Sequence, residues 1–191
     1  MGLDISVITD NYDNLLSGEY MDNLKSNHQL HGLSRTFCNF MCRKNVVDHI
    51  AELDQIGEIT NVDVSVFYDM EAYPDDEGLE FFLETAENEE ERGQIVASAE
   101  ADKQKVSGNI DLILNTVATI INRLTPIDNL PAILLPTEFD SLNNAVYFTD
   151  FKKDKVESYT RNNFGQDLRN FKQFLEYAKN TGATTVWFTY N

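Results

Sequence analysis

The sequence predicts an α+β fold in which a small mixed or antiparallel sheet is packed by helices mainly on one side. Strand-like segments lie near both ends, at residues 3–8 and 184–190, and helical patterns are grouped between them. The 191 residues and the 42% hydrophobic content are enough for one core, so we expect a single acidic domain over residues 1–191.

Four segments have the pattern of β-strands. Residues 3–8 alternate apolar and polar side chains, and residues 184–190 are β-branched and aromatic throughout. Valines at alternate positions of residues 62–66 have the period of a half-exposed strand. Residues 145–151 are the fourth such segment.

Two short helices are expected in the first third of the chain. Ser34 can cap a nearly all-apolar helix, and Asn45 can cap a second one that Gly57 would end. The apolar residues of the first are Phe37, Phe40 and Met41, and the inward stripe of the second is Val46, Ile50 and Leu53.

Two longer helices are expected in the second half. The clearest amphipathic pattern covers residues 110–124 and is halted by Pro126. A last helix has the stripe Leu168, Phe171, Leu175 and Ala178. Residues 125–144 form a connection with three prolines that is longer than most loops in compact domains, which makes it a candidate functional loop.

The formal net charge of −17 is concentrated in one part of the chain. Residues 48–102 hold eighteen acidic residues and one basic residue, whereas residues 1–47 and 103–191 are nearly neutral. Self-repulsion in such a segment opposes compaction, so a further role for the charge is expected. Asn88 can cap a helix whose first turn is Glu89 to Glu91, but this accounts for only three of the carboxylates.

Within the acidic segment, an apolar stripe and an acidic stripe predict one helix with two faces. The apolar stripe is Leu79, Phe82, Leu83 and Ala86, and the acidic stripe is Glu80, Glu84, Glu87 and Glu91. We expect the partner-binding residues to be Asp75, Asp76, Glu77, Glu80, Glu84, Glu87 and Glu91. If the whole segment were one helix, it would carry less net charge per unit length than nucleic acid does. We therefore expect it to mimic nucleic acid only locally.

Metal sites are not favoured by the spacing of potential ligands. His28, His31, Cys38 and Cys42 match none of the usual zinc patterns, and two buried structural thiols are the simpler interpretation. The acidic residues between Asp69 and Glu77 fail the calcium-loop pattern, because Pro74 stands where that loop needs glycine. We expect no metal and no cofactor.

Catalytic signatures are also absent. The sequence contains no glycine-rich nucleotide loop and no nucleophile elbow. His31, near Arg35, is the only histidine within a cluster of polar groups at an expected helix start. A small enzyme or small-ligand binder with a site near His31, Arg35 or the 125–144 loop is therefore the alternative to a binding protein.

The segment from Lys152 to Lys179 carries seven bases and four acids, with aromatic residues among them. Such a pattern can bind single-stranded nucleic acid, but the net charge of the chain would repel a polyanion. We expect this segment to face the acidic segment of the same chain, with no direct binding of nucleic acid.

The two ends of the chain resemble a known group of proteins. Met1-Gly2-Leu3-Asp4-Ile5 is similar to the opening of small phage and bacterial proteins, and Tyr177-Ala178-Lys179-Asn180-Thr181-Gly182-Ala183 is similar to the ends of some of them. The resemblance implies a phage or prophage origin. By charge, the acidic segment also resembles the nucleic-acid mimics that phages use to occupy host defence enzymes.

Together these observations predict a binding protein. We expect an acidic module, encoded by a phage as an inhibitor, that occupies a basic, nucleic-acid-binding surface of a host protein. The absence of a long apolar run and of a signal-peptide pattern predicts a soluble, cytoplasmic chain with no membrane partner.

Overall fold

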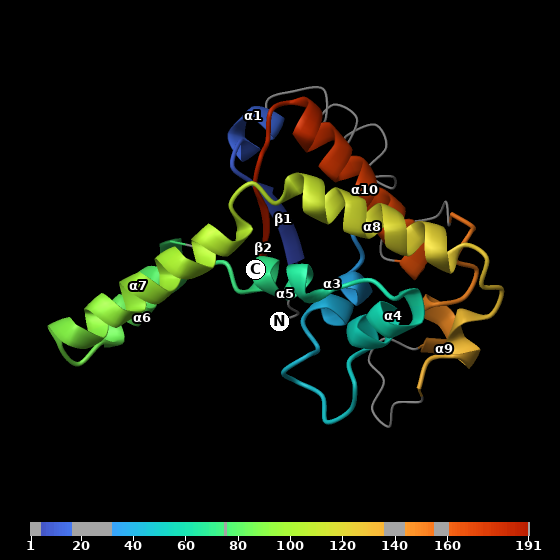
Figure 1. Ribbon diagram of the computed structural model, residues 1–191, viewed down its shortest axis with the longest axis horizontal. Helices are drawn as coiled ribbons and strands as arrows, with labels where there is room; N and C mark the ends of the chain where they lie inside the picture. The colour runs from blue at the N-terminus through green and yellow to red at the C-terminus, as the bar shows by residue number, and fades with distance from the viewer. Residues whose placement is uncertain (1–4, 17–31, 75, 136–143, 155–160, 191) are drawn as a thin grey trace.

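The computed structural model describes residues 5–16, 32–74, 76–135, 144–154 and 161–190, and shows a helical body from which a two-helix arm projects (Figure 1). The arm consists of residues 76–106, and the body consists of the other described residues. The predicted α+β class is confirmed, with a small antiparallel sheet and helices packed mainly on one side.

The sheet joins two segments from opposite ends of the sequence. Strand β1 (Ile5–Thr9) pairs antiparallel with β2 (Val186–Tyr190), so that Val7 lies opposite Phe188. Just beyond β1, the Asp10 carboxylate accepts hydrogen bonds from the backbone N–H and the hydroxyl of Thr184, at 3.0 and 2.5 Å. The strands predicted at both ends of the chain are therefore confirmed.

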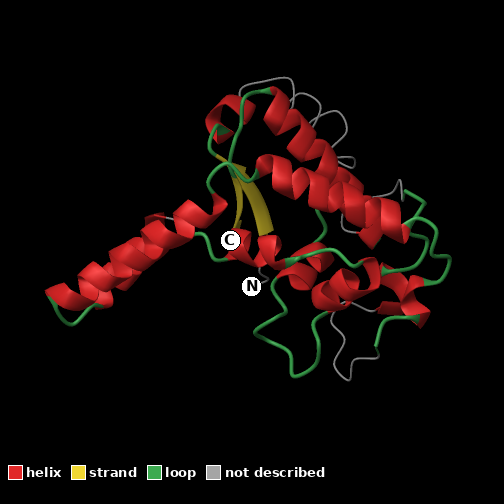
Figure 2. Cartoon of the chain, in the orientation of Figure 1, coloured by secondary structure: helices red, strands yellow, loops and turns green. Residues whose placement is uncertain are grey.

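Two long helices, α8 (Ile110–Leu124) and α10 (Phe164–Asn180), pack against each other beside the sheet (Figure 2). Both were predicted from their apolar periodicity. The side chain of Asn109, at the start of α8, donates to the carbonyl of Val186 and accepts from its N–H, each at 2.8 Å. This paired contact fixes α8 to the edge of β2.

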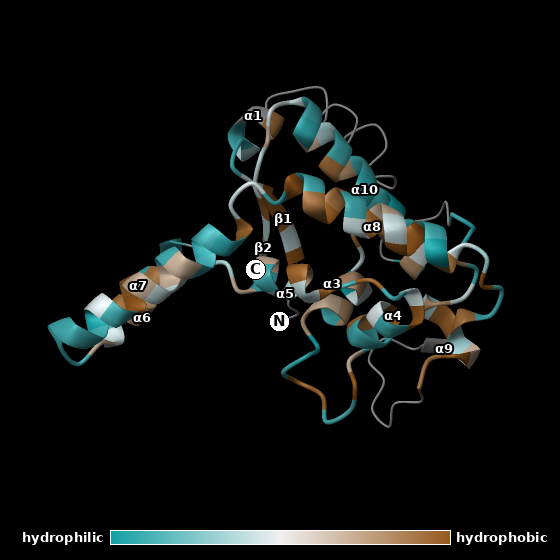
Figure 3. Ribbon diagram, in the orientation of Figure 1, coloured by the Kyte–Doolittle hydropathy of each residue, from teal (hydrophilic) through white to brown (hydrophobic). Residues whose placement is uncertain are grey.

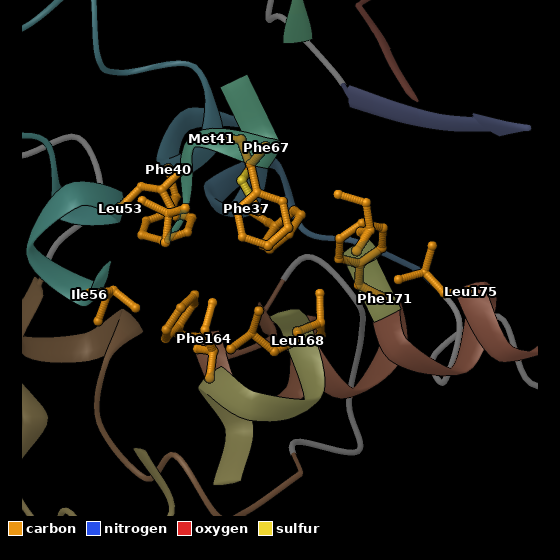
Figure 4. Packing of buried hydrophobic residues seen from close by; sticks show 14 of the residues in the cluster. Phe37, Phe40, Met41, Leu53, Ile56, Phe67, Phe164, Leu168, Phe171 and Leu175 are labelled. Atoms are coloured by element: carbon orange, nitrogen blue, oxygen red, sulfur yellow. The ribbon is translucent and has the colours of Figure 1, made fainter. Parts of the chain in front are cut away.

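Three short helices, α3 (Arg35–Met41), α4 (Glu52–Thr60) and α5 (Ser65–Glu71), complete the core. Their apolar side chains face those of α10 in Figure 4, where Phe37 and Phe67 lie near Phe171. The ring centroids of Phe37 and Phe171 are 5.9 Å apart, in an edge-to-face arrangement that aromatic pairs favour. As predicted, Ser34 caps α3 by accepting the N–H of Phe37.

Smaller elements lie around this core. They are α1 (Tyr12–Leu16), the 3₁₀ turn η1 (Leu130–Ala132) and α9 (Asn144–Tyr147). The arm is formed by α6 (Asp76–Thr85) and α7 (Glu89–Val106), which run side by side away from the body (Figure 1). No helix among the described residues is both long enough and apolar enough to cross a membrane.

The helix predicted from Asn45 to Gly57 is wrong in position. Helix α4 begins only at Glu52, and the expected inward residue Val46 is 77% exposed. Gly57 lies inside α4, where a Cβ atom would come within 3.1 Å of the Val62 carbonyl oxygen. Glycine at this position therefore allows a close approach of the next segment, and the helix ends instead at Asn61, which has a φ of 49°.

Two predicted strands are also wrong. Residues 62–66 lead into α5, because the Asp63 carboxylate accepts the N–H of Ser65 at 2.9 Å and starts a turn. Val64 and Phe67 are then both buried, at helical spacing. Residues 145–151 form the end of α9 and a turn at Asp150, whose φ is 52°.

Candidate protein-binding surface

The turn between α6 and α7 is fixed by a local network of polar groups. The Asn88 side chain accepts the N–H of Glu91 at 2.9 Å, and the Glu91 carboxylate accepts the N–H of Glu87 at 2.7 Å. Glu89 and Glu90 join Glu91 in the first turn of α7, where the positive end of the helix dipole favours carboxylates. The predicted cap at Asn88 is confirmed.

The two helices of the arm share only a thin apolar seam. Its half-buried members are Leu79, Leu83, Ala86 and Ile95, and Ala99 is buried near the body. The Arg92 guanidinium donates to the carbonyl oxygen of Leu83 at 2.7 Å and so links the helices near the outer end. At the inner end, Lys103 Nζ lies 3.7 Å from the Asp76 carboxylate.

The predicted acidic stripe is divided between two helices and a turn. Asp76, Glu80 and Glu84 are exposed on α6, which ends at Thr85, and Glu87 is exposed in the turn. The expectation of one continuous helix is therefore wrong. Glu91 is half-buried on α7, with its carboxylate used in the turn. Asp75 lies outside the described residues. Glu77 belongs to α6, and the structure describes its backbone only.

The arm nevertheless holds much of the negative charge. Its sequence contains ten acidic and three basic residues. Apart from Asp75, the remaining acidic residues of segment 48–102 belong to the body, where some are bonded internally. Asp54 accepts the hydroxyl of Tyr68 at 2.8 Å, and buried Glu52 accepts the Arg43 guanidinium at 2.8 Å. The exposed carboxylates are thus divided between the arm and the body.

Two adjacent aromatic side chains are exposed among these carboxylates. Phe81 and Phe82 are 62% and 57% exposed, and their ring centroids lie 5.8 Å apart. Figure 3 shows hydrophobic residues part-way along the arm and hydrophilic residues at its outer end. Sequence reasoning assigned Phe82 to the inward stripe and missed Phe81. Neighbouring helix positions point about 100° apart, so two large apolar residues in succession cannot both face a thin seam.

An apolar groove lies where the arm meets the body. We call it the base groove; its volume is about 500 Å³. Its lining residues are Glu71, Ala72, Tyr73, Pro74, Gly78, Leu79, Phe82, Ile95, Ser98, Ala99, Asp102, Phe188 and Thr189. The ring of Tyr73 stacks on Trp187 with centroids 4.4 Å apart, which joins the α5–α6 connection to strand β2.

Five bases of the segment from Lys152 to Lys179 form ion pairs outside the acidic segment, contrary to expectation. These ion pairs are made with acidic residues of the C-terminal part of the chain. Arg169 binds Asp154 at 2.5 Å, and Lys179 binds Asp111 at 2.5 Å. These bases are pairing partners for nearby acids, so they leave the charge of the arm in place.

The potential zinc ligands lie only partly within the described residues. His28 and His31 fall outside them, Cys38 is buried and Cys42 is half-buried. A hydrogen bond with Cys38 is the main cause that lowers the pKa of Cys42 to about 7. Among the described residues, no group of three or more histidine, cysteine or acidic side chains could hold a metal ion.

The alternative site near His31, Arg35 and residues 125–144 lies only partly within the described residues, because His31 and residues 136–143 fall outside them. Arg35 is exposed at the start of α3, and the connection is described only as far as Leu135, whose N–H donates to Gln55 at 2.7 Å. Neither the base groove nor a second cavity, between Ile50 and Val64, is lined by these residues.

The most perturbed acidic group lies nearby, in the core. Burial raises the pKa of Asp167 to about 6, against the lowering effect of hydrogen bonds from Ser34, Asn162 and Tyr147. One carboxylate oxygen accepts the Ser34 N–H and the Asn162 amide; the other accepts the Ser34 and Tyr147 hydroxyls. Asp167 is fully buried, so this cluster fixes α3 to α10 and offers no access to a substrate.

No family model matches the chain, and no curated protein and no solved structure matches it.

Proposed function

We propose that the chain is an acidic protein-binding module whose arm occupies a basic, nucleic-acid-binding surface of another protein. The observation that carries the proposal is the projection of two exposed acidic helices from a packed body (Figure 1). The resemblance of residues 1–5 and 177–183 to phage proteins supports an inhibitor encoded by a phage and directed at a host protein.

Because α6 and α7 fold back on each other, the arm carries more charge per unit length than the same residues would carry in one continuous helix. Helix α7 has 18 residues and is about 27 Å long at 1.5 Å per residue. The net charge of −7 on residues 76–106 then corresponds to roughly one charge per 4 Å of arm. A single nucleic-acid strand has one charge per about 3.4 Å and a duplex one per about 1.7 Å. The arm is therefore comparable with a single strand and sparser than a duplex.

The exposed aromatic pair adds a second kind of contact. Phe81 lies beside Glu80 on α6, and Glu84 is one turn further along. Aromatic residues within a well-packed contact dominate many protein interfaces, whereas peripheral charges set the rate and specificity of association. The arm thus combines an aromatic anchor with carboxylates that would meet lysine and arginine side chains.

A matched pair of charge variants tests the proposal. The arm variant carries Glu80→Gln, Glu84→Gln and Glu87→Gln, and it leaves Glu91 in place because that carboxylate fixes the turn. The body variant carries Asp13→Asn, Asp48→Asn and Glu58→Gln, which removes the same charge from exposed residues of the body.

The immobilised wild-type chain and both variants are used to capture proteins from a bacterial lysate at low and high salt, and each captured protein is then competed with single-stranded DNA. We expect the wild-type chain and the body variant to retain a DNA-binding protein at low salt and release it to DNA. The arm variant should retain much less. Equal retention by both variants, or retention that salt and DNA leave unchanged, would contradict the proposal.

A further inference from the structure

The base groove is a second recognition element, distinct from the acidic outer surface of the arm. We propose that it takes one large apolar side chain of a basic partner segment, whose flanking lysine or arginine residues lie against the arm carboxylates. This inference rests on the proposed function and names the partner chemistry at the same surface.

The lining of the groove fits an apolar side chain. Its volume of about 500 Å³ lies within the range of roughly 300–1,000 Å³ that is usual for binding pockets. Most of the lining is apolar, and it comes from the α5–α6 connection, from both helices of the arm and from β2. The apolar members without a hydroxyl group are Ala72, Pro74, Leu79, Phe82, Ile95, Ala99 and Phe188.

One wall of the groove is held by the body and the other is exposed. Phe188 is 2% exposed and packs on Phe171 with ring centroids 5.9 Å apart, so the body wall is preformed. On the arm wall, Phe82 is 57% exposed although it lines the groove. A large apolar side chain in the groove would remove part of the Phe82 ring from water, and burial of apolar surface is favourable.

The charge around the groove selects a basic partner. Asp102 lies in the lining, and Asp76 and Glu80 stand on α6 beside lining residues. Two lysines are close: Lys105 binds Asp102 at 2.9 Å, and Lys103 lies 3.7 Å from Asp76. Each pair has one exposed partner, and surface pairs of this kind contribute little stability, so a partner cation can replace them.

The same charges argue against other ligands of an apolar groove. The arm as a whole has ten acidic and three basic residues, which repel a nucleic acid or an anionic lipid surface. A neutral apolar ligand would gain nothing from the surrounding carboxylates. A basic segment with one large apolar residue uses both features.

Three short peptides test the inference by amide chemical-shift titration of the isotopically labelled chain. The first has a central phenylalanine flanked by lysines, the second has serine in place of the phenylalanine, and the third keeps the phenylalanine but has serines in place of the lysines. We expect the first to bind about tenfold more tightly than the second, because it buries the aromatic ring. Only the first should strongly shift the amides of Ser98, Ala99 and Thr189.

Substitutions in and beside the groove provide the control. Ser98→Trp places a large side chain in the groove, whereas Gln94→Trp adds the same side chain one turn away, at a residue outside the lining. Ser98→Trp should abolish the advantage of the phenylalanine peptide, and Gln94→Trp should leave it. Phe82→Ala, at an exposed position, should reduce the advantage without unfolding the chain.

The outcomes separate the inference from the proposed function. Equal binding of the two lysine peptides, or an advantage that survives Ser98→Trp, overturns the groove as an anchor site while leaving the acidic arm as a binding surface. Equal binding of both phenylalanine peptides shows that charge plays no part and overturns the basic partner. If neither lysine peptide shifts any arm amide at low salt, the proposed function fails as well.

Discussion

The body and the arm are held together by different interactions. In the body, side chains such as Phe37 and Phe171 are fully buried and pack from several helices, whereas α7 has only Ala99 and Val106 buried along 18 residues. The arm relies on the Asn88 cap, the Arg92 link and a thin seam. Stability in the body therefore comes from apolar burial, and the arm is a lightly held extension whose side chains remain available for contact.

The largest difference between the body and the arm is expected in the free energy of unfolding that is lost when a phenylalanine is replaced by alanine. Phe171→Ala should lower the free energy of unfolding by about 4 kcal/mol, because it leaves a cavity among Phe37, Phe67 and Phe188. Phe81→Ala, at a 62% exposed position, should change it by less than about 0.5 kcal/mol. Urea denaturation of the two variants measures both values, and similar losses would show that the arm is part of the cooperative core.

The next largest effect is expected at a glycine of the body. A Cβ atom at Gly165 would lie 1.9 Å from the carbonyl oxygen of Phe151, a backbone atom that cannot move without shifting its segment. Gly165→Ala should therefore destabilise the chain by about 3 kcal/mol, measured as a lower urea midpoint. A neutral substitution would mean that α10 and the turn at Phe151 do not approach as closely as described.

The buried carboxyl of Asp167 should make the body sensitive to pH. Its pKa is raised from the ordinary 3.8 to about 6 in the folded chain, so the folded state binds more protons than the unfolded state between these values. The contribution of Asp167 to the free energy of unfolding is fully present below about pH 4 and is lost as the pH rises through about 6. The free energy of unfolding should fall over this range by on the order of 3 kcal/mol at most.

Asp167→Asn is the control for this pH effect. Its amide oxygen can accept the two N–H donors, and its NH₂ group can donate to the hydroxyls of Ser34 and Tyr147. As the pH is raised from 4 to 6, the urea midpoint should fall more steeply for the wild-type chain than for the variant. Parallel curves would assign the pH dependence to other acidic groups.

The smallest effect is expected in the arm. Gly93 lies within α7, and apart from its chain neighbours and the adjacent backbone of the helix nothing lies within 4 Å of the position that a Cβ atom would take, so Gly93→Ala should stabilise the helix by about 1 kcal/mol. Amide hydrogen exchange in α7 should slow by roughly fivefold while the global urea midpoint stays unchanged. A midpoint that rises with the substitution would show that the arm and the body unfold together.

Sequence reasoning succeeded where long periodic patterns coincide with end signals. Residues 110–124 have an uninterrupted apolar stripe followed by Pro126, and Ser34 and Asn88 are strong caps; all three were predicted correctly. It failed for residues 62–66, because three alternate valines fit a strand and also the start of a helix. In that case, the Asp63 turn decides the outcome.

The arm itself was only partly predictable. Its acidic charge, its apolar positions and the Asn88 cap are visible in the sequence, but no glycine or proline marks the reversal between Thr85 and Glu89. Projection from the body depends on what the rest of the chain leaves uncovered, which is a tertiary property. The succession of Phe81 and Phe82 was the available sign that one aromatic ring would remain in water.

The pairing of β1 with β2 also has a consequence for the order in which the chain folds. Asp10 and Thr184, which hydrogen-bond beside this sheet, are 174 positions apart in the sequence. Closing a loop of this length costs conformational entropy, and during synthesis the first strand has no partner until residues 186–190 have emerged from the ribosome. We therefore expect the helical layers to assemble first and the sheet to close over them in the final step.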